Sequence, residues 1–203
     1  MIGLSESNND DSKNGTRTPI ILEQLSKIQF GEHNIMVYDS LNVFREVYSG
    51  YAKNRLVANN EIVIILTYLE TVKSVEYYLK EAGIDADKYA REGSLVIVDS
   101  VKQFFGTGVD FLQYLKIVDR NAREMGKRGI SVIADMGAFD LLGKVDELLK
   151  YETSIPPMSP EIKCSSLLCS YHAKSFGRLA QDVKDKILDQ HHRKFRAESA
   201  PES

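Results

Sequence analysis

The chain has 203 residues, 43% of them hydrophobic, which suits one globular domain with a substantial core. Its formal net charge is −3, which argues against the strongly basic surface of a nucleic-acid-binding protein. No stretch approaches the roughly 18 apolar residues that a membrane span needs, and the N-terminus lacks the charged and apolar regions of a secretory signal. We therefore expect a soluble cytoplasmic protein without membrane or direct nucleic-acid contacts.

The two ends of the chain differ in composition from its centre. Residues 1–19 are polar and rich in Asn, Asp and Ser, and we expect them to be disordered, as we do the tail at 197–203. Residues 20–196 then form a single domain. Near its start, "ILEQLSKIQF" (residues 21–30) suits a short helix or an arm.

Five apolar runs of strand length follow one another through this domain. They are rich in Val and Ile and mostly apolar on both faces, as expected for strands that helices cover above and below. The runs occupy residues 34–38 ("NIMVY"), 61–67 ("EIVIILT"), 94–99 ("SLVIVD"), 130–135 ("ISVIAD") and 166–171 ("SLLCSY").

Helical patterns separate these runs. Apolar residues recur at helical spacing over residues 41–56, 111–125 and 176–187. Gly83 and Gly129 follow helix ends, where a left-handed residue is favoured. The residues placed to cap helix starts are Ser40, Thr71, Asp110, Asp140 and Ser175. The repeated strand–helix alternation predicts an α/β fold: a mainly parallel sheet of at least five strands with helices on both faces.

Polar residues gather where the predicted strands end. Ligands of open parallel sheets bind at the carboxyl ends of the strands, although most polar side chains there are expected to cap the following helices. Capping does not require tyrosines, which stand at three of these ends and suit a pocket for a small organic ligand. The candidate ligand-binding residues are Tyr38, Asp39, Ser40, Tyr68, Glu70, Asp99, Asp135, Tyr171 and His172.

These strand ends offer no complete catalytic set. His172 could pair with Asp135 or Asp99, and Glu70 could act as a base, but no serine has the Gly-x-Ser-x-Gly setting of a hydrolase nucleophile. We expect no enzymatic activity, and a cryptic enzyme is the least favoured alternative.

The only cysteines are Cys164 and Cys169. Their spacing on a strand sends the two side chains to opposite faces, which argues against a disulfide or a shared metal ion. A zinc site made of Cys169, His172 and the pair His191-His192 would follow no standard ligand spacing. We therefore expect buried structural thiols, a solvated or edge-packed histidine pair, and neither metal nor cofactor.

Longer stretches of the sequence resemble known families. Residues 59–100 are similar to the second strand–helix–strand unit of KaiC-type RecA-like ATPases, in which a strand ends in a Thr-aromatic-Glu-Glu run. Residues 31–195 resemble the MEDS sensory domain, a RecA/KaiC-like domain named after methanogen and methylotroph proteins and the DcmR regulator. The shared features, in order, are "GEHNIMVYDS", "GSLVIVDS", "LLKYETSI" and "LLCSYHAKSF…ILDQHH".

The resemblance implies a RecA-like three-layer fold that senses small, hydrocarbon-like or one-carbon ligands in proteins carrying DNA-binding domains or histidine kinases. We expect a stand-alone, non-catalytic sensor that binds a small organic ligand over the strand ends and relays to a partner histidine kinase or transcriptional regulator. The alternative is a degenerate RecA-like scaffold that acts only through protein contacts, as a homo-oligomer like its ATPase relatives.

The comparison with the ATPases also argues against ATP hydrolysis. A Walker A loop needs glycines to wrap the phosphates, a lysine for their oxygens and a Ser or Thr for Mg²⁺. The first turn of this chain, Tyr38-Asp39-Ser40, has neither glycine nor lysine, and Asp39 would repel a phosphate. Where KaiC-type proteins place two glutamates, the chain has Leu69 and Glu70.

Overall fold

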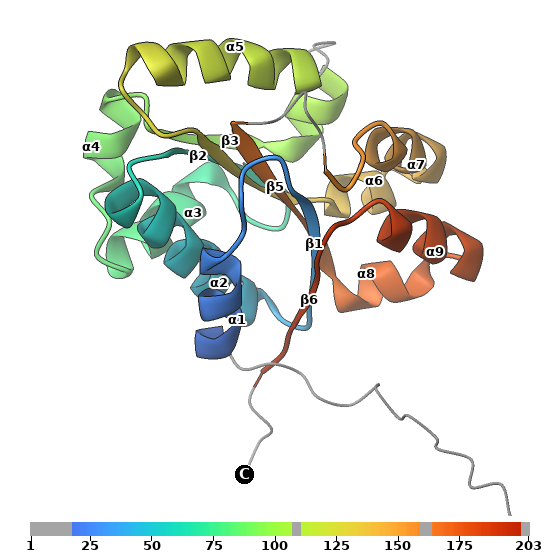
Figure 1. Cartoon of the computed structure of the whole chain (residues 1–203). Helices are drawn as coiled ribbons and strands as arrows, with labels where there is room; N and C mark the ends of the chain where they lie inside the picture. The colour runs from blue at the N-terminus through green and yellow to red at the C-terminus, as the bar shows by residue number, and fades with distance from the viewer. Residues whose placement is uncertain (1–17, 107–110, 159–163, 200–203) are drawn as a thin grey trace, which may run out of the picture.

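A six-stranded parallel sheet forms the centre of the molecule, with the strand order β3-β2-β4-β5-β1-β6 (Figure 1). The structure is a computed structural model that describes residues 18–106, 111–158 and 164–199. The strands are β1 (His33–Tyr38), β2 (Ile62–Thr67), β3 (Leu95–Asp99), β4 (Ile130–Asp135), β5 (Ser165–His172) and β6 (Lys194–Ala197).

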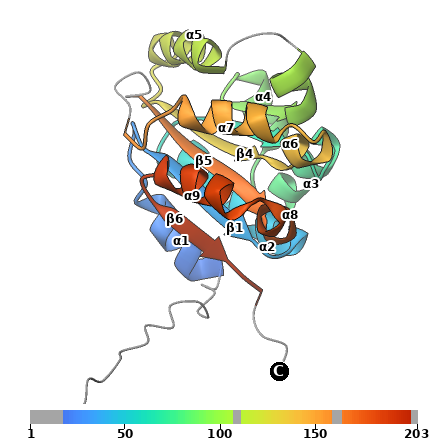
Figure 2. The ribbon, with the colours of Figure 1, turned by 90° about the vertical axis from the view of Figure 1, so that its right-hand side faces the viewer.

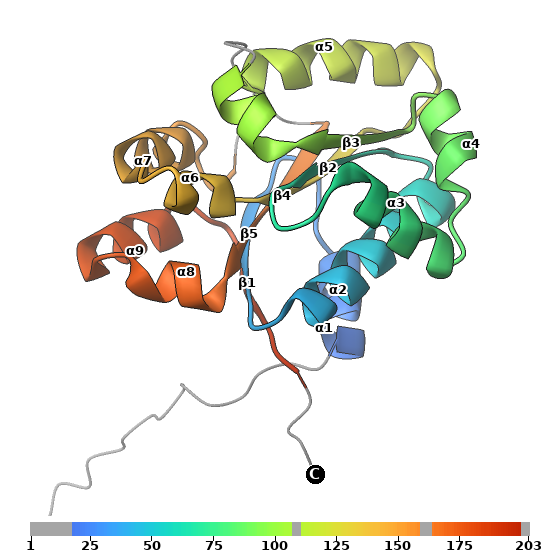
Figure 3. The ribbon, with the colours of Figure 1, turned by 180° about the vertical axis from the view of Figure 1, so that it is seen from behind.

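Helices cover both faces of this sheet and give the predicted three layers (Figures 1 and 3). One face carries α1 (Thr18–Ser26), α2 (Leu41–Lys53), the π-helical turn η1 (Asn54–Ala58), α3 (Val72–Glu81) and α4 (Ala86–Arg91). The other face carries the π-helical turn η2 (Lys102–Gly106), α5 (Phe111–Glu124), α6 (Gly137–Leu141), α7 (Val145–Thr153), α8 (Ala173–Arg178) and α9 (Gln181–Asp189). Figure 2 shows α7, α8 and α9 in front of the strands.

Alternation along the central strands divides the core into two halves. In β4, Ile133 packs among the helices of the first face, while Val132 and Ala134 pack among those of the second. Because successive side chains of a strand point to opposite faces, a strand with helices on both sides is mostly apolar on both of its faces. The five predicted strands are confirmed to within one residue at each end.

The sixth strand, β6, was not predicted from the sequence. It pairs with β1 at the edge of the sheet, and only Phe195 and Ala197 of its four residues are buried. A short edge strand with one apolar face has too few apolar residues for its alternating hydrophobic pattern to be recognised in the sequence. The strand also takes in Ala197, which the sequence analysis placed in the tail.

The helix starts agree with the sequence in part. Ser40 caps α2 by accepting a hydrogen bond from Val43 N (3.3 Å), and Thr71 caps α3 through Ser74 N (3.2 Å). His172, which was not predicted as a cap, accepts from Lys174 N (3.2 Å) at the start of α8.

Other predicted caps were wrong. Asp140 lies inside α6 and Ser175 inside α8, because these helices begin four and three residues earlier than expected. Asp110 lies outside the described residues. The single helix predicted over 176–187 is two helices, since Leu179 and Ala180 have extended backbone.

Two glycines of the helix ends differ in their roles. Gly83 has a φ of 80°, as predicted for a residue that ends α3. Gly129 does not have a positive φ, and Gly126 (φ 68°) takes that place after α5. A side chain at Gly129 would put its Cβ 2.5 Å from the carbonyl oxygen of Cys164, so close backbone packing requires the glycine. Within the described residues, no helix has the length and apolar character to cross a membrane.

Candidate functional site

Asp135 organises the carboxyl ends of the central strands. It ends β4, and its two oxygens accept hydrogen bonds from Leu69 N (3.2 Å) and Gly137 N (3.0 Å). Burial raises the pKa of Asp135 to about 6, although these backbone donors oppose the shift. The ring of Tyr68 lies over Gly137, where a side chain would have no room.

Tyr38, at the end of β1, lies near the same carboxylate. Its side chain is fully buried, and its hydroxyl has no hydrogen-bond partner among the described residues. Burial, followed by the nearby Asp135, raises the pKa of the Tyr38 hydroxyl. Its ring also meets that of His172 edge to face, with 5.5 Å between centroids. Three of the predicted residues, Tyr38, Tyr68 and Asp135, therefore gather around one point.

A small pocket adjoins this group on the side of α6 and α8. Gly137 and His172, which both contact the group, also line the pocket, and its volume is about 10 Å³. The remaining lining residues are Met136, Asp140, Leu148, Tyr171, Ser175 and Leu179. A space of this size has room for about one water molecule.

Glu70 bonds to residues of α2 and α3 rather than to the group of Tyr38, Tyr68 and Asp135. Its carboxylate accepts hydrogen bonds from Arg45 Nε (2.9 Å), Tyr48 Oη (3.1 Å) and Ser74 Oγ (2.6 Å). These contacts join α2 to the start of α3. Asp99 ends the edge strand β3, where it is exposed and accepts from Lys102 N (2.9 Å).

The first turn, where a phosphate loop would lie in an ATPase, is occupied by contacts within the chain. Asp39 accepts hydrogen bonds from Ser199 N (2.7 Å) and Ser199 Oγ (3.2 Å), so the segment after β6 lies against it. Ser40 caps α2 and contacts Ser199 Oγ at 3.2 Å. Both residues therefore have partners that account for their polar groups.

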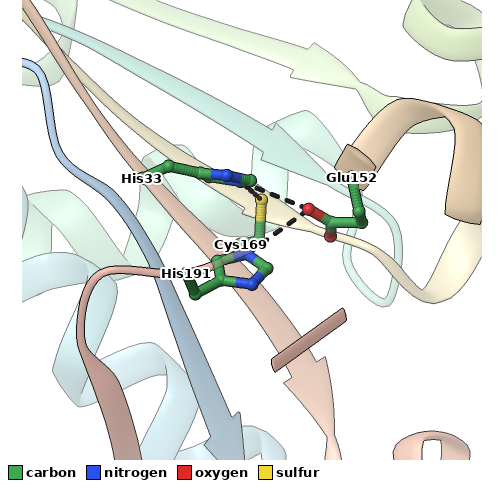
Figure 4. A group of neighbouring side chains, drawn as sticks. All are labelled: His33, Glu152, Cys169 and His191. Carbon is green, nitrogen blue, oxygen red and sulfur yellow. Dashed lines mark hydrogen bonds and ion pairs between the residues drawn. The ribbon is translucent and has the colours of Figure 1, made fainter. Parts of the chain in front are cut away.

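A second group of polar side chains lies inside the molecule, on the face covered by α5–α9 (Figure 4). His33 opens β1, Cys169 lies on β5, Glu152 lies on α7, and His191 follows α9. All four are buried, and one potential metal-ligand atom from each lies within 4.8 Å of the others.

Hydrogen bonds fix the orientation of both histidine rings. His33 Nδ1 donates to the carbonyl oxygen of Ile155 (3.1 Å), and His191 Nδ1 donates to that of Ile187 (2.6 Å). Because a carbonyl oxygen can only accept, each Nδ1 carries a proton. The Nε2 atoms therefore point inward.

Glu152 stands between the two inward-pointing nitrogens. Its Oε2 lies 3.2 Å from His33 Nε2 and 3.3 Å from His191 Nε2, while Oε1 accepts a hydrogen bond from Tyr171. Cys169 Sγ lies 3.3 Å from His33 Nε2. The cluster thus presents two imidazole nitrogens, a carboxylate oxygen and a sulfur around one centre, a donor set that could hold a metal ion.

Electrostatics favour an ionised Glu152 at this centre. Burial alone raises its pKa, but His191 and His33 more than offset that effect and hold the pKa of Glu152 below its usual range. Burial, and then the Glu152 charge, raise the pKa of the Cys169 thiol and of the Tyr171 hydroxyl.

This cluster was not predicted from the sequence, where a zinc site of Cys169, His172 and the His191-His192 pair was considered and set aside. The expectation that His191 lies in solvent or on the sheet edge is wrong, since the side chain is fully buried. Tyr171 lines the small pocket, and its hydroxyl bonds to Glu152. His33 and Cys169 lie 136 residues apart in sequence, so spacing could not link them. One usable signal was that Cys169 and Tyr171, two positions apart on a strand, share a face.

Comparisons with known proteins agree with the fold. The family model "MEthanogen/methylotroph, DcmR Sensory domain" (MEDS) matches residues 32–191. Among solved structures, the chain is similar to a KaiC-like protein from the hyperthermophilic archaeon Pyrococcus horikoshii, with a TM-score of 0.56 and 15% identity, covering 86% of this chain and 75% of that chain. This likeness supports the RecA/KaiC-like fold alone, and no curated protein matches the chain. Because the family model covers most of its length, the chain belongs to the MEDS sensory-domain family.

Proposed function

We propose that this sensory domain is non-catalytic and binds a small, uncharged organic molecule over the carboxyl ends of β1, β4 and β5. The observation that carries the proposal is the buried Tyr38 hydroxyl, which lies beside the Asp135 carboxylate without a hydrogen bond of good geometry to it or to any other described residue. An unsatisfied buried polar group costs about 1–3 kcal/mol. A ligand that accepts a hydrogen bond from Tyr38 would recover part of that cost.

The adjoining pocket has room for about one water molecule, so it would have to widen to admit a ligand of even a few non-hydrogen atoms. Its walls combine apolar side chains such as Leu148 and Leu179 with polar groups at His172 and Ser175. A nearby carboxylate, Asp135, disfavours an anion. The first turn adds a second argument against nucleotides, because Asp39 and Ser199 occupy it.

An exposed apolar pair supports the relay of binding to a partner. Leu141 in α6 and the adjacent Leu142 are 62% and 43% exposed. The same helix contributes Gly137 and Asp140 to the pocket, and Asp140 pairs with Arg178 of α8. A ligand that changes the spacing of α6 and α8 would therefore move an apolar surface suited to a histidine kinase or transcriptional regulator. The shift is limited by the difference in ligand affinity between the two states.

A thermal-shift screen with short-chain and one-carbon organic compounds tests the proposal, with ATP and Mg²⁺ as the contrasting ligand. We expect a small organic compound to raise the melting temperature of the wild type and of Tyr48→Phe, whose hydroxyl bonds to Glu70. The same compound should leave Tyr38→Phe unchanged, because that variant lacks the free hydroxyl.

Two results would contradict this proposal. Stabilisation by ATP and Mg²⁺ would indicate a nucleotide site despite the altered first turn. A screen in which no compound stabilises the protein, combined with tight binding of a kinase or regulator, would favour the scaffold that acts only through protein contacts.

A further inference from the structure

We propose that His33, Glu152, Cys169 and His191 bind one divalent transition-metal ion, and that their donor set fits Zn²⁺ best. The site lies among the helices of the second face and shares none of these four residues with the proposed ligand site. It therefore does not depend on the proposed sensing function.

The positions of the protons are the first argument. Both Nδ1 atoms carry hydrogens because they donate to carbonyl oxygens, so each neutral ring turns an Nε2 lone pair toward Glu152. The Cys169 thiol can give its proton to only one acceptor. With neutral rings, Glu152 Oε2 and His191 Nε2 have no hydrogen-bond partner among the described residues. Lone pairs that face one another in this way need a positive charge between them, which either a metal ion or a proton on an imidazole ring can supply.

Charge balance is the second argument. One imidazolium would balance the Glu152 charge, whereas two would leave a net positive charge where the side chains of His33, Glu152 and His191 are fully buried. An uncompensated buried charge is costly. A divalent cation with a thiolate, a carboxylate and two neutral imidazoles has no net charge.

The distances are the third argument. Tetrahedral zinc has bonds of about 2.0–2.3 Å to nitrogen, oxygen and sulfur, so its ligand atoms lie roughly 3.3–3.6 Å from one another. The separations from Glu152 Oε2 to the two Nε2 atoms are 3.2 and 3.3 Å, and that from His33 Nε2 to Cys169 Sγ is 3.3 Å. The other separations among the four atoms are at most 4.8 Å, so small movements of the side chains would centre an ion among them (Figure 4).

The surrounding contacts also match a metal centre. Metal-binding histidines commonly donate their second ring N–H to a backbone carbonyl, as both rings do here. Tyr171 occupies Oε1 of Glu152, which leaves Oε2 as a single oxygen ligand. Imidazole and thiolate ligands suit zinc rather than Mg²⁺ or Ca²⁺. Four protein ligands without solvent exposure make a closed, structural site, which would tie β1, β5, α7 and the segment after α9 together.

Metal content and cobalt substitution test the site in the full chain, purified without a histidine tag. We expect about one equivalent of zinc per chain by elemental analysis. Replacing it with Co²⁺ should give the visible absorption of a tetrahedral ion and a sulfur-to-cobalt charge-transfer band. Cys169→Ser should lose the charge-transfer band, and His191→Gln should lose at least tenfold in Co²⁺ affinity.

Two matched variants serve as controls. Cys164→Ser changes the partly exposed cysteine near Arg123, and His192→Gln changes the exposed neighbour of His191. Both should keep the wild-type cobalt spectrum. Equal losses in the controls and the ligand variants would contradict the site.

Nitrogen NMR of the wild-type histidine rings keeps the proposal falsifiable if the ligand variants do not fold. Metal binding predicts that the Nε2 atoms of His33 and His191 lack protons and shift when Co²⁺ or Cd²⁺ replaces zinc. Folded wild-type protein that takes up no metal, or that has either ring doubly protonated at neutral pH, would overturn the proposal.

Discussion

Two buried polar clusters on this sheet balance their charges differently. On one side, Glu61 accepts hydrogen bonds from Arg55 (3.4 Å) and Ser131 (2.5 Å) on its two oxygens. Arg55 also donates to the carbonyl oxygens of Leu25 and Ile28, both at 2.9 Å. Around Glu152, by contrast, two nitrogens and a sulfur face the carboxylate, and only Tyr171 brings a clear donor.

The two clusters differ in the number of hydrogen-bond donors that face the carboxylate. A guanidinium is always charged and offers five N–H groups, so Arg55 balances the Glu61 charge without any added ion, although Arg55 Nε has no hydrogen-bond partner among the described residues. A neutral imidazole whose Nδ1 donates elsewhere offers only a lone pair. We infer that the first cluster is structural without an added ion, whereas a bound cation stabilises the second.

Zinc should stabilise the protein through the second cluster only. With free zinc at about 1,000 times its dissociation constant, the free energy of unfolding should rise by about 4 kcal/mol. The Glu61→Gln variant should show the same zinc-dependent rise in the free energy of unfolding, because the Arg55–Glu61 cluster binds no ion. His191→Gln should show almost none. Urea unfolding at fixed free zinc measures all three, and an equal gain in His191→Gln would remove the contrast.

Glu61→Gln should lower the free energy of unfolding by about 3 kcal/mol, because Arg55 is left as an unpaired buried charge. The loss should be the same with and without a chelator. Ser131→Ala removes a neutral donor to the same carboxylate and should cost less. Urea unfolding of the three proteins would contradict the interpretation if the Glu61→Gln loss depended on zinc.

Asp135 is a third buried carboxylate, held by backbone N–H groups instead of a cation. Its pKa is raised to about 6 in the folded state, above its value of about 4 in the unfolded chain. The folded protein therefore binds the extra proton between these values. The stability that Asp135 contributes is fully present below about pH 4 and is lost as the pH rises to about 6.

The size of this effect is roughly 2–3 kcal/mol for a group buried to this extent. Asp135→Asn should flatten that part of the stability profile, measured by urea unfolding from pH 4 to pH 7. Asp99→Asn, an exposed residue at the end of the edge strand, is the matched control and should leave the profile unchanged. A wild-type slope that persists in Asp135→Asn would assign the titration to another group.

Ser40→Ala should give the smallest change, a loss of about 1 kcal/mol from removal of the N-cap of α2. The residue lies at a partly exposed helix end, so the loss should depend on neither zinc nor pH. Asn42→Ala, within the first turn of the same helix, controls for a general change in helix propensity. A much larger loss for Ser40→Ala would show that the first turn has a role beyond capping.

The predicted candidate site was only partly assembled by the structure. Tyr38, Tyr68 and Asp135 come together because the carboxyl ends of the parallel strands β1, β2 and β4 lie on the same side of the sheet. The sequence pattern implied this arrangement. Asp99 falls outside the group because β3 is the edge strand, and strand order depends on long-range pairing. Nothing in the local pattern of the chain specifies that order.

Most elements of this protein follow from its sequence. Apolar runs and helical spacing are local consequences of burial, so five strands, the parallel sheet and a first turn without a glycine-rich phosphate loop could be deduced from neighbouring residues. The sixth strand and the cluster proposed to bind a metal ion depended on the tertiary structure. His33, Glu152, Cys169 and His191 come from four separate segments, and their lone pairs face one another only after β1, β5, α7 and α9 have packed. Side chains that are distant in sequence converge only when the helices and strands pack together, and a local sequence pattern does not specify that packing.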